Sequence, residues 1–139
     1  MRGVRGVSIK LNRFLNSNNK GISVLSKPDK IYMNNPNLQY VIGTAHTNIG
    51  SVRESFFVNQ LQGLHRLALP KQGDFIVDDK YIFEIEGKKK SKKQIKNIEN
   101  AFIVKDNIEN GFQNYIPLGY LGYCINRFTS TRGKQRKFR

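Results

Sequence analysis

The chain has 139 residues, a length that suits one domain with a modest core. Its 24 lysines and arginines outnumber ten acidic residues, and the net charge of +14 favours a polyanionic partner, foremost nucleic acid. Because Cys124 is the only cysteine, no disulfide forms within the chain, and a reducing cytoplasm is the expected compartment. No apolar run reaches the roughly 18 residues of a membrane span, so no membrane contact is expected.

The first third of the sequence predicts short elements. Residues 1–19 form a basic, asparagine-rich segment, in which Leu11–Leu15 is expected to close a helix. A strand is predicted from Lys30 to Met33, and Asn34-Asn35-Pro36-Asn37 has the composition of a turn. Leu38–Ile42 is expected to add one further apolar turn or strand.

The clearest helix prediction runs from Ser51 to about Leu64, where apolar residues recur at helical spacing. The start Ser51-Val52-Arg53-Glu54 has the form of a capping box, in which the serine caps the helix and Glu54 reaches back to it. Glu54 has an alternative role, because it is the helix acid nearest in sequence to the acidic block at residues 74–86.

A β-hairpin follows, with strands Phe75–Val77 and Tyr81–Ile85 joined by Asp78-Asp79-Lys80. This loop pairs Val77 with Tyr81 and sets Asp74 opposite Glu84. Ala101–Val104 is predicted to be a buried strand, whereas residues 126–139 are basic and expected to be disordered. Ser91 is expected to cap a short helix that runs through Ile98. The order of strand, helix, hairpin, helix and strand indicates one mixed α/β domain over residues 20–125.

The hairpin concentrates acidic residues, since five of the ten in the chain lie between Asp74 and Glu86. One interpretation is a solvated hairpin whose acids are offset by neighbouring lysines. The other is a Mg²⁺ site in which Asp74 and Glu84 supply the hard oxygen ligands that this ion prefers, with Glu54 as a third carboxylate. A nearby lysine would then orient or deprotonate the attacking water, while the ion polarises a phosphodiester.

A run of lysines directly follows the acidic hairpin in the sequence. Its members are expected either to contact phosphates or to form a solvated face. They are Lys88, Lys89, Lys90, Lys92 and Lys93.

Several blocks of the sequence resemble a known family over roughly residues 20–123. They are "KPDKIYMNNPNLQYVIG", "NIGSVRESFFVNQL", "GDFIVDDKYIFEIEGKKKSKKQIKNIENAFIVKDNIENGF" and "IPLGYLGY". The family is the C-terminal domain of unknown function of predicted prokaryotic AAA-type ATPases, which is similar to the restriction-endonuclease-like, PD-(D/E)-x-K nuclease fold. The resemblance therefore implies a mixed sheet flanked by helices.

The resemblance also implies roles for individual residues. Asp74 matches the first motif acid, with Gly73 where a proline often stands, and Glu84 matches the second acid. Glu86 occupies the position of the motif lysine, so Glu86-Gly87-Lys88 would serve as a displaced E-x-K with Lys88 as the catalytic lysine. Glu54 matches the glutamate that many such nucleases carry on their first helix.

The ATPase module of the family carries a phosphate-binding loop, but no G-x(4)-G-K-[ST] occurs in this chain, so no ATP site is expected here. The resemblance implies a detached or truncated accessory module that binds nucleic acid and retains a degenerate Mg²⁺ site. One alternative is an active Mg²⁺-dependent phosphodiesterase. Another is a module that docks onto an ATPase domain or a partner protein without touching nucleic acid.

Overall fold

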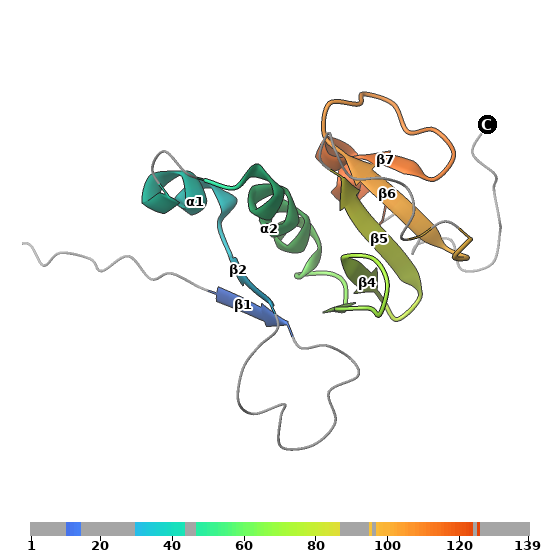
Figure 1. The fold of residues 1–139 in the computed structure, drawn as a ribbon, viewed down its shortest axis with the longest axis horizontal. Helices are drawn as coiled ribbons and strands as arrows, with labels where there is room; N and C mark the ends of the chain where they lie inside the picture. The colour runs from blue at the N-terminus through green and yellow to red at the C-terminus, as the bar shows by residue number, and fades with distance from the viewer. Residues whose placement is uncertain are drawn as a thin grey trace, which may run out of the picture.

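The computed structural model describes residues 11–14, 30–43, 47–86, 95, 97–123 and 125, and for residues 11–14 only the backbone. Within these residues the chain forms one small α/β domain, in which a mixed five-stranded sheet is flanked by helices (Figure 1). The mixed α/β architecture predicted from the sequence is therefore confirmed. The lysine run and the predicted tail, residues 126–139, lie outside the described residues.

The sheet joins an antiparallel half to a parallel half. Its strand order is β3-β4-β5-β6-β7, with β3, β4 and β5 antiparallel and β5, β6 and β7 parallel. The carboxyl ends of the three parallel strands consequently lie at the same end of the sheet. The strands are β3 (Leu67–Ala68), β4 (Phe75–Val77), β5 (Tyr81–Glu86), β6 (Ala101–Lys105) and β7 (Tyr115–Pro117).

The β4–β5 hairpin has the predicted register from Val77–Tyr81 to Phe75–Phe83, but the paired residues do not include the predicted Asp74–Glu84 pair, because β4 begins at Phe75. Asp78 and Asp79 have φ angles of 52° and 56°, and the Lys80 N–H donates to the Val77 carbonyl at 3.1 Å. Aspartate tolerates this left-handed conformation better than most residues, since its short side chain bonds nearby backbone groups. The loop sequence thus determines the tight connection.

One face of the sheet packs against helix α2 (Ile49–Leu61). The Phe57 ring of this helix lies 5.1 Å from the Phe75 ring and 5.3 Å from the Phe83 ring, centroid to centroid. Phe57 and Phe75 are completely buried, and aromatic rings of this size dominate the energetics of a small core. This contact fixes α2 on the sheet and thereby positions the polar side chains on the helical turn that precedes Phe57.

The opposite face of the sheet carries a smaller cluster of Ile95, Ala101 and Ile103, against which Ile82 packs. Side chains alternate along a strand, so Phe83 and Ile85 of β5 face the α2 core while Ile82 and Glu84 face this second cluster.

A second, two-stranded sheet pairs β1 (Leu11–Phe14) with β2 (Lys30–Met33), and Leu11 lies opposite Met33. The predicted strand at Lys30–Met33 is confirmed. The helix predicted at Leu11–Leu15 is wrong for residues 11–14, because their backbone groups pair with β2 instead of with one another. Pairing with a distant strand overrides local preference here.

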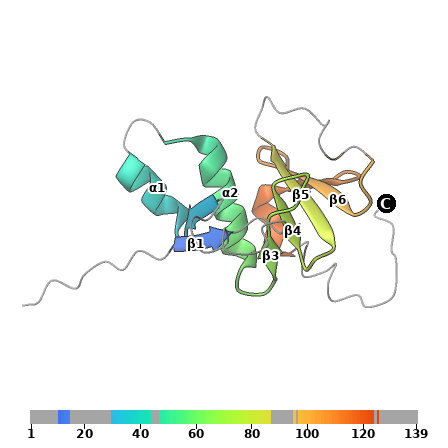
Figure 2. The ribbon, with the colours of Figure 1, turned by 60° about the horizontal axis from the view of Figure 1, so that its bottom comes forward.

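Helix α1 (Pro36–Gly43) replaces the predicted turn and apolar strand. Pro36 occupies its first position, where the missing N–H costs nothing, and the Asn35 side chain accepts a hydrogen bond from the Asn37 N–H at 2.9 Å. The turn composition therefore starts a helix. In two views α2 lies between the five-stranded sheet and the unit formed by α1, β1 and β2 (Figures 1 and 2).

Candidate functional site

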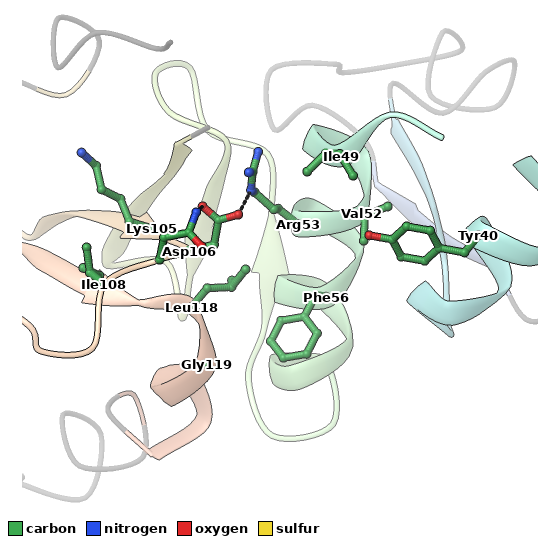
Figure 3. Close-up of a pocket in the computed structure, with 11 residues that line it drawn as sticks. Tyr40, Ile49, Val52, Arg53, Phe56, Lys105, Asp106, Ile108, Leu118 and Gly119 are labelled. Atoms are coloured by element: carbon green, nitrogen blue, oxygen red, sulfur yellow. Dashed lines mark hydrogen bonds and ion pairs between the residues drawn. The ribbon is translucent and has the colours of Figure 1, made fainter. Parts of the chain in front are cut away.

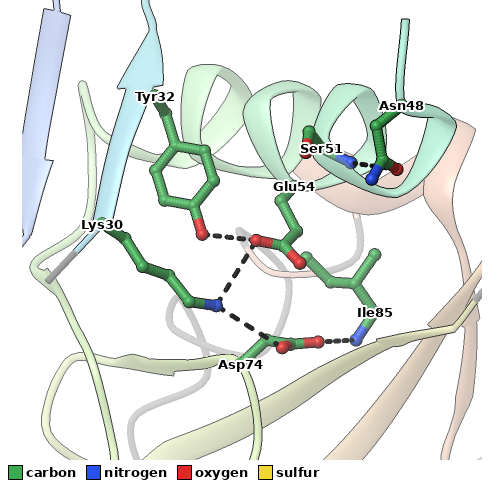
Figure 4. A network of polar contacts seen from close by, with 7 residues as sticks. All are labelled: Lys30, Tyr32, Asn48, Ser51, Glu54, Asp74 and Ile85. Atoms are coloured by element: carbon green, nitrogen blue, oxygen red, sulfur yellow. Dashed lines mark hydrogen bonds and ion pairs between the residues drawn. The ribbon is translucent and has the colours of Figure 1, made fainter. Parts of the chain in front are cut away.

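The position of Glu54 follows from the start of α2. The N-cap is Asn48, whose side chain accepts from the Gly50 N–H at 2.8 Å and from the Ser51 N–H at 3.4 Å. The predicted capping box at Ser51 is therefore wrong, and Glu54 does not serve it. Its carboxylate instead points away from the helix end toward β2 (Figure 4).

Strand β2 supplies two partners for Glu54. Lys30 and Tyr32 lie on the same side of the strand because side chains alternate, while Ile31 between them is 52% exposed. The Lys30 ammonium lies 3.4 Å from Glu54 Oε2, and the Tyr32 hydroxyl donates to the same oxygen. Glu54 is thus held from β2 by both a cation and a neutral donor.

The backbone conformation of Gly73 positions the Asp74 side chain near Glu54 and Lys30. Its φ is +90°, and a Cβ there would lie 2.8 Å from Ile82 Cγ2. A proline, with φ near −65°, cannot adopt this conformation, so it would not fit at this position. The Asp74 N–H donates to the Phe83 carbonyl at 2.9 Å, and Asp74 Oδ2 accepts from the Ile85 N–H at 2.9 Å.

Lys30, Tyr32, Glu54 and Asp74 form one group of polar side chains, which we call the Lys30 cluster. The Lys30 ammonium lies 3.7 Å from Asp74 Oδ1, so it contacts both carboxylates (Figure 4). Burial raises the pKa of Tyr32 far above its usual value, and the hydrogen bond to Glu54, the negative charge of Glu54 and that of Asp74 add to this. Tyr32 therefore remains protonated and acts as a donor.

Glu84 lies outside the Lys30 cluster, because its side chain projects from the other face of β5, where its cross-strand neighbour is Ile103. It is 2% exposed. Glu86, two residues further on the same face, is 3% exposed and forms an ion pair with Lys105 at 3.1 Å. The structure thus brings Asp74 and Glu54 together and separates them from Glu84.

The remaining predicted site residues, Lys88, Lys89, Lys90, Lys92 and Lys93, lie outside the described residues. The described part of the chain contains no group of three or more histidine, cysteine, aspartate or glutamate side chains in a metal-binding arrangement. The assignment of Asp74 and Glu84 as joint metal ligands therefore stays a prediction.

A cavity of about 450 Å³ lies between α2 and the loop after β6 (Figure 3). Arg53 of α2 and Asp106 of the loop form an ion pair across it, with 2.5 Å between Nε and Oδ2. Apolar side chains line much of the rest, among them Val52, Phe56 and Leu118. Arg53 is neutralised by Asp106, and Lys105, which also lines the cavity, forms an ion pair with Glu86, so the cavity offers little unpaired charge to a ligand.

A second polar contact ties the end of α2 to the hairpin. His65 Nδ1 lies 2.8 Å from Asp78 Oδ2, and Asp78 Oδ1 accepts from the Arg66 N–H at 3.0 Å. Partial burial opposes ionisation of Asp78, but the hydrogen bonds from His65 and Arg66 prevail and hold the pKa of this carboxyl below its usual value. This contact is structural, since it closes the hairpin against the helix.

The described residues are not basic. They contain nine acidic residues and seven of the 24 lysines and arginines, so the remaining 17 cationic residues lie in segments outside them. Four of the seven take part in ion pairs with aspartate or glutamate: Lys30, Arg53, Arg66 and Lys105. The other three are Arg13, Lys71 and Lys80.

Sequence reasoning missed Lys30 and Tyr32, although the alternation in "KIYM" places both on one face of a strand. Nothing local shows that this face meets Glu54, which lies 24 and 22 residues further along the chain.

Comparison of the chain with protein-family models, curated proteins and solved structures finds no significant match. Among the described helices, none combines the length and apolar character needed to cross a membrane.

Proposed function

We propose that this chain is an accessory module that binds nucleic acid through its basic segments. The observation that best supports this proposal is the uneven distribution of charge along the chain. Seventeen of the 24 cationic residues, but only one of the ten acidic residues, lie outside the described residues. Phosphate contacts supply most of the affinity in non-specific binding, and they require such an excess of cations.

The α/β domain itself is a poor source of phosphate contacts. Its nine acidic residues repel a polyanion, and its Lys30, Arg53 and Lys105 ammonium or guanidinium groups already face carboxylates. In this proposal the cations that contact phosphates lie outside the described residues. The lysine run after β5 and residues 126–139 are then the main contacts.

The restriction-endonuclease-like fold and the relation to AAA-type ATPases belong to the same proposal. Support comes from the mixed sheet, in which an antiparallel hairpin bearing Asp74 and Glu84 continues into parallel strands with α2 on one face. An accessory module of this kind has no ATP chemistry of its own, so we assign ATP hydrolysis to a separate ATPase domain.

Binding of a labelled oligonucleotide by the full chain, followed by fluorescence anisotropy across a salt series, tests the proposal. The affinity should fall steeply with salt, because counterions are released when phosphates are neutralised. DNA and RNA of several sequences should bind alike, since phosphate contacts carry no base information. A salt-independent affinity, or no binding even at low salt, would contradict the proposal.

The runner-up function is a Mg²⁺-dependent phosphodiesterase. It is favoured by the proximity of Asp74 and Glu54, both of which contact the Lys30 ammonium. Their carboxylate oxygens suit Mg²⁺, and the ammonium stands in for a cation between them, so this pair fits the ion. When bound, the ion would polarise a phosphodiester. Lys88 keeps its predicted role as catalytic lysine in this candidate, whereas Glu84 projects from the other face of β5 and is not one of the two carboxylates.

A nuclease assay with Mg²⁺ or Mn²⁺ separates this candidate from simple binding. Cleavage that requires the metal and disappears in Asp74→Asn would support the phosphodiesterase. Salt-sensitive binding without cleavage would leave the accessory module with a degenerate site.

A protein-docking role has one favourable observation. Helix α1 bears no charged residue, and its Tyr40, Val41 and Ile42 are 52%, 74% and 52% exposed. Exposed apolar side chains in sequence are typical of interaction surfaces. A chain that pairs with an ATPase domain but shows no affinity for nucleic acid would favour docking alone.

A further inference from the structure

The Lys30 ammonium occupies the place between two carboxylates that a bound cation would take. It lies 3.4 Å from Glu54 Oε2 and 3.7 Å from Asp74 Oδ1. The side chains of Glu54 and Asp74 are only 18% and 10% exposed. Two such carboxylates repel each other unless a positive charge lies between them, and within the described residues Lys30 supplies it.

Neither carboxylate depends on Lys30 for its orientation. Asp74 Oδ2 accepts from the Ile85 N–H at 2.9 Å, and Glu54 Oε2 accepts from the Tyr32 hydroxyl. Both donors are neutral and belong to the buried part of the fold. The two carboxylates would therefore stay in place if the ammonium left, which is the condition for a preorganised cation site.

Lys30 itself is held loosely. Its two contact distances exceed the 2.7–2.9 Å that is typical of strong charge-assisted hydrogen bonds. Its side chain is 37% exposed, so its ammonium has water close by when it moves away. A flexible side chain of this kind can leave its partners at a small energetic cost.

We propose that Lys30 is an internal competitor for a divalent cation, and that removal or displacement of its ammonium opens a site made by Glu54 and Asp74. The bound species would be a small hard cation such as Mg²⁺ or Mn²⁺, held by carboxylate oxygens and water. This inference rests on the metal site of the runner-up function, and it assigns the second ligand to Glu54 instead of Glu84.

Calorimetric titration with Mn²⁺ of the chelator-treated full chain tests the competition. Lys30→Met should bind one Mn²⁺ at least about tenfold more tightly than the wild type. A tenfold difference is expected if the Lys30 ammonium occupies the site in about nine of ten wild-type molecules, so that only about one in ten can bind the ion. Adding Glu54→Gln to Lys30→Met should abolish this binding. Lys80→Met, which removes one positive charge from the hairpin turn, serves as the matched control and should bind like the wild type.

Equal affinity in Lys30→Met and the wild type would overturn the proposal, as would an equal gain in Lys80→Met or binding retained without Glu54. If Lys30→Met does not fold alone, Mn²⁺ should restore its folding, because a ligand of the native state stabilises that state. Failure of Mn²⁺ to do so would also overturn it. The oligonucleotide titration is independent, so a chain with this Mn²⁺ response but no affinity for nucleic acid would refute only the proposed function.

Discussion

The α/β domain and the segments outside the described residues differ most in charge. The described residues of the domain include nine acidic residues against seven basic ones, whereas the rest of the chain has one acidic residue against 17 basic ones. The net charge of +14 therefore belongs to the whole chain, whereas the described residues taken alone carry two more negative than positive charges.

The two regions also differ in how their charges are used. In the domain, cations serve the fold: Lys30 joins β2 to α2 and β4, Arg53 joins α2 to the loop after β6, and Lys105 neutralises the buried Glu86. We expect substitutions in the domain to change its stability and substitutions in the basic segments to change affinity for nucleic acid. The predictions below test this separation.

The largest expected effect on stability is in the aromatic core. Phe57→Ala removes a completely buried ring that packs on Phe75 and Phe83, and it should lower the free energy of unfolding by about 3–5 kcal/mol. Phe112, which is 68% exposed, provides the control, and Phe112→Ala should change stability little. Urea unfolding measures both. Similar losses in the two variants would show that the core is misplaced.

A smaller loss is expected at the turn before β4. Gly73→Ala places a Cβ 2.8 Å from Ile82 Cγ2 at a φ of +90°, and strain of this kind costs about 1–3 kcal/mol. Gly63→Ala is the matched control, because a Cβ there meets nothing within 4 Å. Thermal unfolding should distinguish the two. If Gly73→Ala is tolerated as well as Gly63→Ala, this account of how Asp74 is directed fails.

The N-cap of α2 should contribute about 1 kcal/mol. Asn48→Ala removes the acceptor for the Gly50 and Ser51 N–H groups and should destabilise the domain by that amount. Ser51→Ala should have a much smaller effect, because Ser51 follows the cap. A capping box at Ser51 instead predicts that Ser51→Ala destabilises the domain more than Asn48→Ala. Unfolding measurements on the two variants therefore decide which residue caps α2.

The smallest effect concerns pH. Hydrogen bonds from His65 and Arg66 prevail over partial burial and lower the pKa of Asp78 in the folded state. This carboxylate therefore adds stability above the unfolded pKa, near 3.9, and the contribution is lost as the pH falls through the lower folded value. Asp78→Asn should show a weaker loss of stability over this acidic range than the wild type. Identical acid unfolding curves would contradict the assignment.

Local features of the fold were predictable from the sequence. The β4–β5 register followed from a three-residue loop rich in aspartate, and the body of α2 followed from its apolar period. The N-cap was displaced from Ser51 to Asn48, because both residue types are good caps and only the final packing selects one. Strand β1 was missed because it depends on pairing with β2, which no short window contains, and helix α1 was missed because the local signals at Asn35 and Pro36 were interpreted as a turn.

The site was predictable only in part. Asp74 and Glu54 were both identified, but their link through Lys30 and Tyr32 spans more than 20 residues and has no local signal. The sequence correctly predicted that Glu84 lies in β5. It did not predict the positive φ of Gly73. It also did not predict that the Asp74 carboxylate accepts from the Ile85 N–H and contacts Lys30, away from Glu84.

The central claim, that the basic segments and not the α/β domain bind nucleic acid, is tested most directly by two variants that each lose three positive charges. One is Lys89→Gln, Lys90→Gln and Lys92→Gln in the lysine run; the other is Arg66→Gln, Lys71→Gln and Lys80→Gln in the domain. The slope of log affinity against log salt, measured with one oligonucleotide, should fall by about three in the first variant, one for each lost phosphate contact. It should stay at the wild-type value in the second. An equal fall in both variants, or a larger fall in the domain variant, would contradict the claim.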